Sequence, residues 1–183
     1  MTSFKYITLS AFLILGVCFA AVHTSCTKDT CKTVTCWNGA SCSGGGCNCL
    51  DGTGGTNCQT IFRTLYTNTY TGNASYASSV ADSNYIPHVD TNSTLVFQAG
   101  NDSNFNKMQL VWNRKSGKSV NMTVVLTNNT PTGSNFTISS AVSDTNSYSG
   151  TGFVNANTAS LSLIESHPNS HAVVVALNNF NRQ

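Results

Sequence analysis

The sequence predicts an all-β protein in which a small disulfide-rich module precedes an antiparallel β-meander, closed as a small barrel or folded as a sandwich. Three observations support this fold class. All eight cysteines lie in the first 58 of the 183 residues. The rest of the chain alternates apolar and polar side chains, and clusters of turn-forming residues separate the alternating runs. Crosslinks should therefore stabilise the first unit, and strand pairing and burial the second.

Residues 1–25 are expected to form a lipoprotein-type signal peptide, followed by a tether at 26–30. Lys5 supplies a positive charge ahead of an uncharged, mostly apolar run at 6–22. The segment around Ser25-Cys26 resembles the start of bacterial lipoproteins. Cleavage there would leave Cys26 as the lipidated N-terminus.

Cysteine parity favours lipidation of Cys26. Cleavage near Ala21 would leave seven cysteines in the mature chain, and an unpaired thiol is unusual in an oxidising compartment. Cleavage before Cys26 removes Cys18 and acylates Cys26, so six cysteines remain to pair. Soluble secretion and an uncleaved membrane anchor stay open as alternatives, since the apolar run is at the short limit for a span.

The module at residues 31–58 has the cysteine spacing C-x4-C-x5-C-x4-C-x-C-x8-C. Its apolar side chains are almost confined to Val34, Trp37 and Leu50, too few to bury a core that offsets the entropy of the chain. Disulfides must therefore hold it together, and six cysteines allow 15 pairings.

The final part of that spacing, Cys47-x-Cys49-x5-Gly55-x2-Cys58, resembles the EGF-like domain family. The resemblance covers residues 31–58. It implies three disulfides, which join Cys31 to Cys42, Cys36 to Cys47, and Cys49 to Cys58.

An EGF-like module can serve as a spacer or as a recognition surface, and both roles stay open. Calcium-binding members of the family resemble one another in an acidic cluster before the first cysteine. Only Asp29 stands there in this chain, and one carboxylate does not satisfy a cation that takes six or more oxygen ligands. Calcium is therefore not expected.

A short linker at 59–64 is expected to lead into a β-domain at 65–183, which contains no cysteine. Apolar side chains recur at every second position, as in half-buried strands, and no stretch keeps a helical period. The clearest runs are Met108–Trp112, Val120–Leu126, Phe136–Ile138, Leu161–Leu163 and Val173–Leu177, with weaker ones at Tyr66–Tyr70, Tyr76–Val80 and Thr94–Gln98.

The composition argues against several function classes. Charged residues make up 9% of the chain, against about a quarter in ordinary domains, and the net charge of +2 includes no basic run longer than Arg114-Lys115. Nucleic-acid binding is therefore not expected. No pair of carboxylates and no G-x-S-x-G motif indicates a hydrolase, so the chain is expected to be no enzyme and to need no cofactor.

A weak candidate metal site lies near the C-terminus. Glu165, His167 and His171 flank a short turn, which would bring the two histidines together across a hairpin. Glu165 lies two residues from His167 and is therefore expected on the same face of the strand. Exposed histidines beside a turn are the commoner outcome.

The organisation also resembles that of small bacterial surface lipoproteins with a C-terminal β-domain. The resulting expectation is a non-enzymatic protein of the cell envelope, in which an EGF-like spacer presents a β-domain that binds an extracellular protein or glycan. An accessory structural subunit of an envelope complex, or a barrel that carries or transforms a small ligand, are the alternatives. The expected location is lipid-anchored and surface-exposed, with secretion as the alternative.

Overall fold

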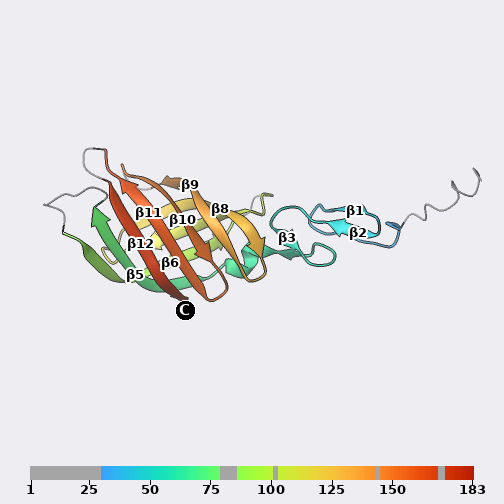
Figure 1. Cartoon of the computed structure of the whole chain (residues 1–183), viewed down its shortest axis with the longest axis horizontal. Helices are drawn as coiled ribbons and strands as arrows, with labels where there is room; N and C mark the ends of the chain where they lie inside the picture. The colour runs from blue at the N-terminus through green and yellow to red at the C-terminus, as the bar shows by residue number, and fades with distance from the viewer. Residues whose placement is uncertain (1–29, 79–85, 101–102, 143–144, 169–171) are drawn as a thin grey trace, which may run out of the picture.

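The protein consists of a disulfide module and an eight-stranded β-barrel arranged end to end (Figure 1). A computed structural model describes residues 30–78, 86–100, 103–142, 145–168 and 172–183. Sheet closure settles the choice between a barrel and a sandwich that the alternating pattern leaves open. The predicted all-β fold class is confirmed.

The barrel strands follow one another as an antiparallel meander. Because antiparallel neighbours need only short connections, the frequent turn formers suffice to join them. The strands are β5 (Thr69–Ser78), β6 (His88–Ala99), β7 (Lys107–Asn113), β8 (Ser119–Thr130), β9 (Gly133–Val142), β10 (Ser147–Val154), β11 (Thr158–Ser166) and β12 (Val173–Arg182).

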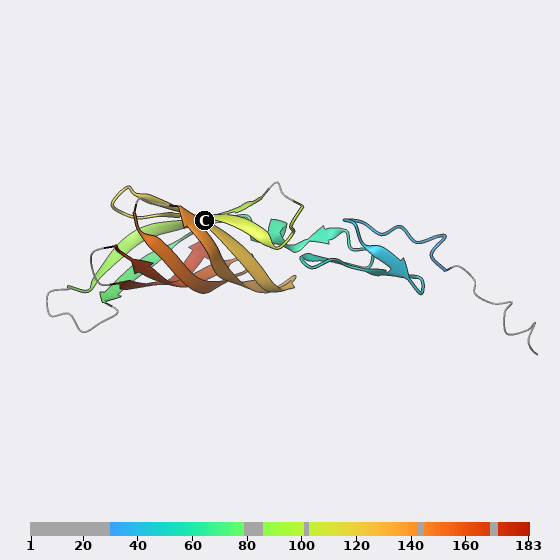
Figure 2. The same ribbon diagram turned by 90° about the horizontal axis from the view of Figure 1, so that it is seen from above.

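Pairing of β12 with β5 closes the cylinder, in a ladder that runs from Val173 opposite Ser78 to Arg182 opposite Tyr70. Seen from above, the strands cross the long axis of the molecule obliquely (Figure 2), as closure of a barrel requires. The alternating apolar residues point inward. Met108, Leu110 and Trp112 of β7 are all buried, whereas Gln109 between them is exposed.

Two segments differ from the predicted strands. Tyr66 does not begin a strand but ends a 3-10 helix, η1 (Phe62–Tyr66). Strand β10 has no apolar alternation in the sequence, because two of its inward positions are Gly150 and Gly152. A side chain at 152 would overlap the ring of Phe136 on the neighbouring strand β9. Glycine is thus needed where two strands and a large interior ring meet.

Helix η1 closes the end of the barrel that faces the module. Phe62 and Tyr66 are buried together with Tyr70 of β5. The hydroxyl of Tyr66 donates to the carbonyl of Thr130, and that of Tyr70 donates to the carbonyl of Asn155 at 2.6 Å. The two tyrosines thereby tie this end of the barrel to the ends of β8 and β10, while their rings complete the core.

The disulfide module is built from two short hairpins. Strands β1 (Ser41–Ser43) and β2 (Gly46–Asn48) form the first, and β3 (Thr53–Gly54) and β4 (Thr60–Ile61) form the second. The range 59–64 expected to be a linker is thus occupied by β4 and the start of η1.

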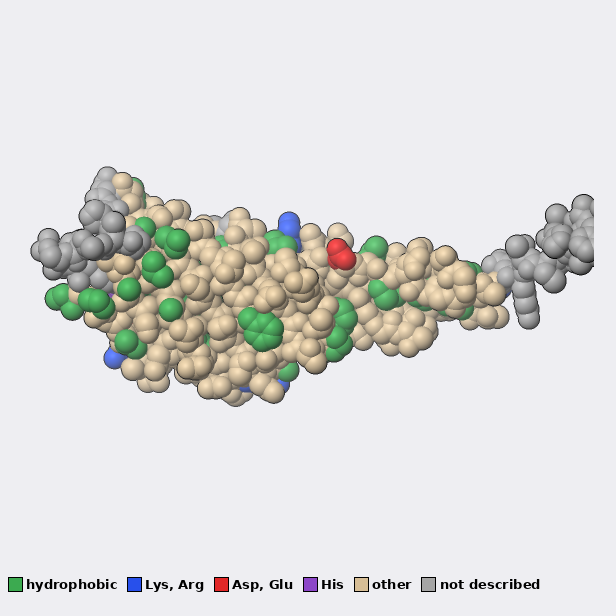
Figure 3. Space-filling view, in the orientation of Figure 1, with side chains coloured by type: hydrophobic (Ala, Val, Ile, Leu, Met, Phe, Trp, Pro, Cys, Tyr) green, Lys and Arg blue, Asp and Glu red, His purple; other side chains and the backbone are tan. Residues whose placement is uncertain are grey.

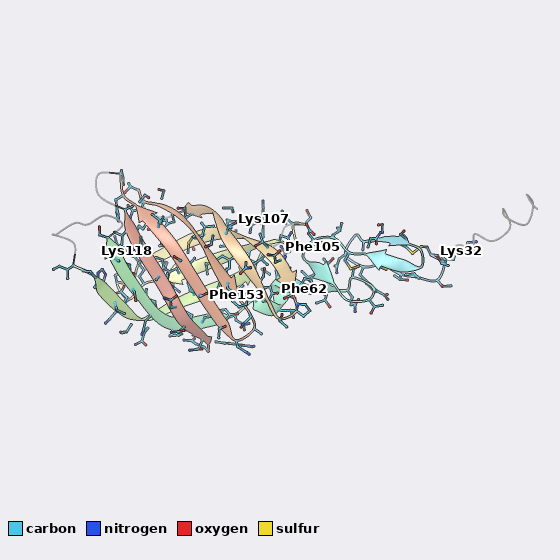
Figure 4. All side chains as sticks on the ribbon, viewed as in Figure 1. Lys32, Phe62, Phe105, Lys107, Lys118 and Phe153 are labelled. Atoms are coloured by element: carbon cyan, nitrogen blue, oxygen red, sulfur yellow. A yellow bond between two sulfur atoms is a disulfide. The ribbon has the colours of Figure 1, made fainter. Side chains whose placement is uncertain are left out.

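The second hairpin packs directly on the barrel. Gly52 has φ +85°, and a Cβ there would lie 2.5 Å from Oδ1 of Asn106 and 2.8 Å from Cβ of Phe105. Arg63 of η1 is also buried, and its Nη1 donates to the carbonyls of Asn104 at 2.8 Å and Lys107 at 3.2 Å. Figure 4 shows Phe62 and Phe105 where the two units meet.

Reduction of the disulfides is expected to unfold the module and spare the barrel. The chain contains no cysteine after residue 58, so the barrel has no disulfide to lose. The module depends on crosslinks that each contribute about 2–4 kcal/mol to its stability. Circular dichroism and thermal melting of the protein, with and without reductant, measure this. Loss of the β-signal on reduction would show instead that the barrel requires the intact module.

Candidate functional site

Three disulfides crosslink the module. They join Cys31 to Cys42, Cys36 to Cys47, and Cys49 to Cys58, which is the pairing that the EGF-like resemblance implies. The Nδ2 of Asn38 donates to the carbonyl of Cys58 at 2.7 Å and so ties the two halves of the module together. The predicted lipidation site, Cys26, lies outside the described residues.

A cluster of polar and aromatic side chains lies at the barrel end opposite the module. We call it the distal cluster, and its members come from the ends of β5 to β7 and of β10 and β11. They are Tyr76, His88, Asp90, Trp112, Arg114, Asn146, Tyr148, Glu165 and His167.

Glu165 is the centre of this cluster and is buried. One carboxylate oxygen, Oε2, accepts a hydrogen bond from Nη2 of Arg114 at 2.9 Å. The other, Oε1, accepts from Nδ2 of Asn146 at 2.8 Å and from the Tyr148 hydroxyl at 3.1 Å. Both oxygens are therefore engaged, as a buried carboxylate requires.

The Arg114 guanidinium covers the inner aromatic side chains. It lies 4.3 Å from the centre of the Trp112 ring, within the range of a cation–π contact. Tyr76 stacks on Trp112 at 6.1 Å and on His88 at 4.4 Å, and its hydroxyl donates to Oδ2 of Asp90 at 3.2 Å. Together these contacts close the distal end of the barrel.

The two tyrosines of the cluster stay protonated. Burial, followed by the negative charge of Asp90, raises the pKa of Tyr76 far above its ordinary value of 10. Burial also raises the pKa of Tyr148, partly offset by Arg114. Both hydroxyls therefore act as hydrogen-bond donors, and neither is a phenolate nucleophile at neutral pH.

The candidate metal ligands are only partly brought together. Nε2 of His167 lies 3.8 Å from Oε1 of Glu165, so these two do share a face. That oxygen already accepts two hydrogen bonds, however. His171 lies outside the described residues. Within the described ranges, no three His, Cys, Asp or Glu side chains are grouped as metal ligands would be.

Large side chains fill the barrel interior. Trp112, Leu110 and Val124 are each 0% exposed. A cavity large enough for water beside any of them would expose part of its surface. At these positions the barrel is therefore packed solid, unlike barrels that hold a small ligand inside.

Arg114, Asn146 and Tyr148 are the hydrogen-bond partners of Glu165, and sequence reasoning missed all three. Alternation along β7 could have found Arg114, because it continues the inward series Met108, Leu110 and Trp112 by one step. No comparable signal identifies Asn146, which precedes β10 and reaches Glu165 only in the folded chain.

Comparison with known proteins gave no match to a family model, a curated protein or a solved structure. The part of the chain that the structure describes also contains no helix with the length and apolar character needed to cross a bilayer.

Proposed function

We propose that this protein is a non-enzymatic surface protein of the cell envelope. A lipid on Cys26 anchors the chain, an EGF-like module at 31–58 spaces it from the membrane, and the barrel binds an extracellular protein or glycan.

The observation that carries the proposal is the packed and internally bonded barrel. Its interior leaves no water-sized space beside Leu110, Trp112 or Val124, and both oxygens of Glu165 are engaged by other side chains. Beside these three side chains the barrel has no room for an interior ligand, and the carboxylate of Glu165 is already hydrogen-bonded within the protein. The outer surface is then the part that meets other molecules.

The character of that surface fits recognition of neutral partners. On the face in Figure 3, most of the surface is backbone and side chains that are neither hydrophobic nor charged, with scattered apolar side chains and few charges. Such a surface offers hydroxyl and amide hydrogen bonds and little electrostatic steering. The three disulfides fit an oxidising location. The module and the barrel lie end to end, which fits a module that separates the barrel from an anchor at the N-terminus.

The anchor is tested by expressing the full chain in a bacterial host beside Cys26→Ala. The parent protein should partition into detergent and begin at Cys26, whereas the variant should stay unprocessed or be released. Pull-down of extracellular proteins and glycans with the purified chain tests binding. A mature N-terminus upstream of Cys26 would exclude the lipid, and failure to retain any partner would contradict the binding role.

A further inference from the structure

A cleft lies between the disulfide module and the end of strand β8, with a volume of about 610 Å³. This is within the range of about 300–1,000 Å³ that is usual for small-ligand sites. One wall is the module segment before β3, and the other is the end of β8 with the residue that precedes β7. The side chains that the argument uses are Leu50, Asp51, Asn106, Asn128 and Asn129.

The walls of the cleft are held in place by contacts that involve no ligand. Asn129 donates to Oδ1 of Asn106 at 2.7 Å and accepts from the Ser134 hydroxyl at 2.7 Å. On the module side, Gly52 packs so closely on Asn106 and Phe105 that no side chain fits between them. The cleft is thus preorganised, which lowers the entropic cost of binding.

Two polar groups on the walls are unused. Of the residues that the structure describes, none donates a hydrogen bond to the Asp51 carboxylate, and none bonds the side-chain amide of Asn128. Both residues are exposed. Asn128 has φ +53° and lies where the pairing of β8 with β9 shifts register between Thr127 and Thr130. This irregularity takes Asn128 out of the regular ladder at the rim of the cleft.

The lining identifies the chemical class of the ligand. An amide both donates and accepts hydrogen bonds, and the carboxylate accepts them, which suits a ligand with many hydroxyl groups. Leu50, which is 48% exposed, adds apolar surface for a carbon face of such a ligand. No Lys or Arg lines the cleft to hold an anion, and one carboxylate is too few for a hard cation.

We propose that this cleft between module and barrel binds a neutral oligosaccharide. The inference rests on the proposed binding function and specifies its ligand class and position. Asp51 and Asn128 would hydrogen-bond sugar hydroxyls from opposite walls, and the module would be part of the binding site as well as a spacer.

The test is binding of neutral trisaccharides to the full chain, purified in a detergent that has no sugar headgroup. Maltotriose, cellotriose, mannotriose and N-acetylchitotriose are the probes, and saturation-transfer NMR and calorimetry are the readouts. We expect at least one to bind. Asp51→Ala and Asn128→Gly should each weaken binding by about tenfold or more. Asp51→Ala removes a hydrogen bond to a charged group, and Asn128→Gly removes the hydrogen bonds of a side-chain amide.

Asn92→Gly is the matched control. Asn92 is exposed and has φ +62°, like Asn128, but it lies on β6 and does not line the cleft. Glycine accepts both backbone conformations, so both variants should fold. Binding in Asn92→Gly should equal that of the parent.

Sugar binding that is unchanged in Asp51→Ala and Asn128→Gly would overturn the assignment of the cleft and leave the proposed function standing. Absence of binding to all the probes at millimolar concentration would overturn the oligosaccharide inference. In that case, capture of an extracellular protein in the pull-down would still support the proposed function. Failure of both experiments would refute both proposals.

Discussion

Trp112→Ala is expected to lower the free energy of unfolding of the barrel by about 3–5 kcal/mol, the range measured when large buried aromatic side chains are truncated. Trp112 is fully buried, stacks with Tyr76 and lies under Arg114. Its removal opens a cavity beneath the half-buried guanidinium of Arg114. Urea denaturation followed by circular dichroism measures the loss.

Trp112→Phe is the control for this substitution. The indole Nε1 is buried and has no hydrogen-bond partner among the described residues, so its removal sacrifices no bond. Phenylalanine keeps an aromatic ring in the same place. Trp112→Phe should therefore lose much less stability than Trp112→Ala. Equal losses for the two variants would contradict the packing described for this position.

Glu165→Ala is expected to have the second large effect and to lower the free energy of unfolding by about 3 kcal/mol. The substitution leaves the Arg114 guanidinium without its carboxylate, and the Arg114 side chain is only 15% exposed. The figure is at the low end of the range for buried pairs because water reaches part of that side chain. Chemical denaturation of the folded protein gives the value.

A double variant separates the lost charge pair from lost packing. Glu165→Leu combined with Arg114→Met replaces both charges with apolar side chains, and should recover most of the stability that Glu165→Ala loses. Asp51→Ala removes an exposed carboxylate and should change stability by no more than about 0.5 kcal/mol. A double variant as unstable as the single one would show that the charges themselves are needed.

The alternating pattern predicted most of the barrel because burial acts on every second residue of a strand. Val120, Met122, Val124 and Leu126 are all buried in β8, as their spacing indicated. The pattern could not decide between a barrel and a sandwich, because both bury one face of each strand. Closure depends on the pairing of β12 with β5, which no local signal encodes.

The failures of prediction have local physical causes. Gly150 and Gly152 occupy inward positions of β10 without contributing apolar side chains, so the strand showed no alternation. Tyr66 fits an alternating run with Tyr70, yet it belongs to η1, where its ring fills the barrel end. An aromatic residue three positions before a strand does not reveal whether the backbone between them is extended.

The candidate site was predictable only in its local part. Glu165 and His167 were expected on one face, and the structure places the carboxylate oxygen and the ring nitrogen 3.8 Å apart. The principal partner of Glu165 is Arg114, which is 51 residues away in the chain and directly follows β7, a strand that does not pair with β11. Only the closed barrel brings these side chains together across its mouth.

Closure of the barrel also determines how the chain can change without losing its fold. Each of the eight strands has a neighbour on both sides along at least part of its length, so stretches with an unpaired edge are confined to strand ends such as 88–93 of β6 and 138–142 of β9. The partner that we propose would then be recognised mainly by side chains. The outward residues can be substituted with little effect on the inward ones, because strand geometry separates the two sets. If the proposed binding function holds, its specificity could therefore diverge while the core, and with it the stability of the barrel, stays the same.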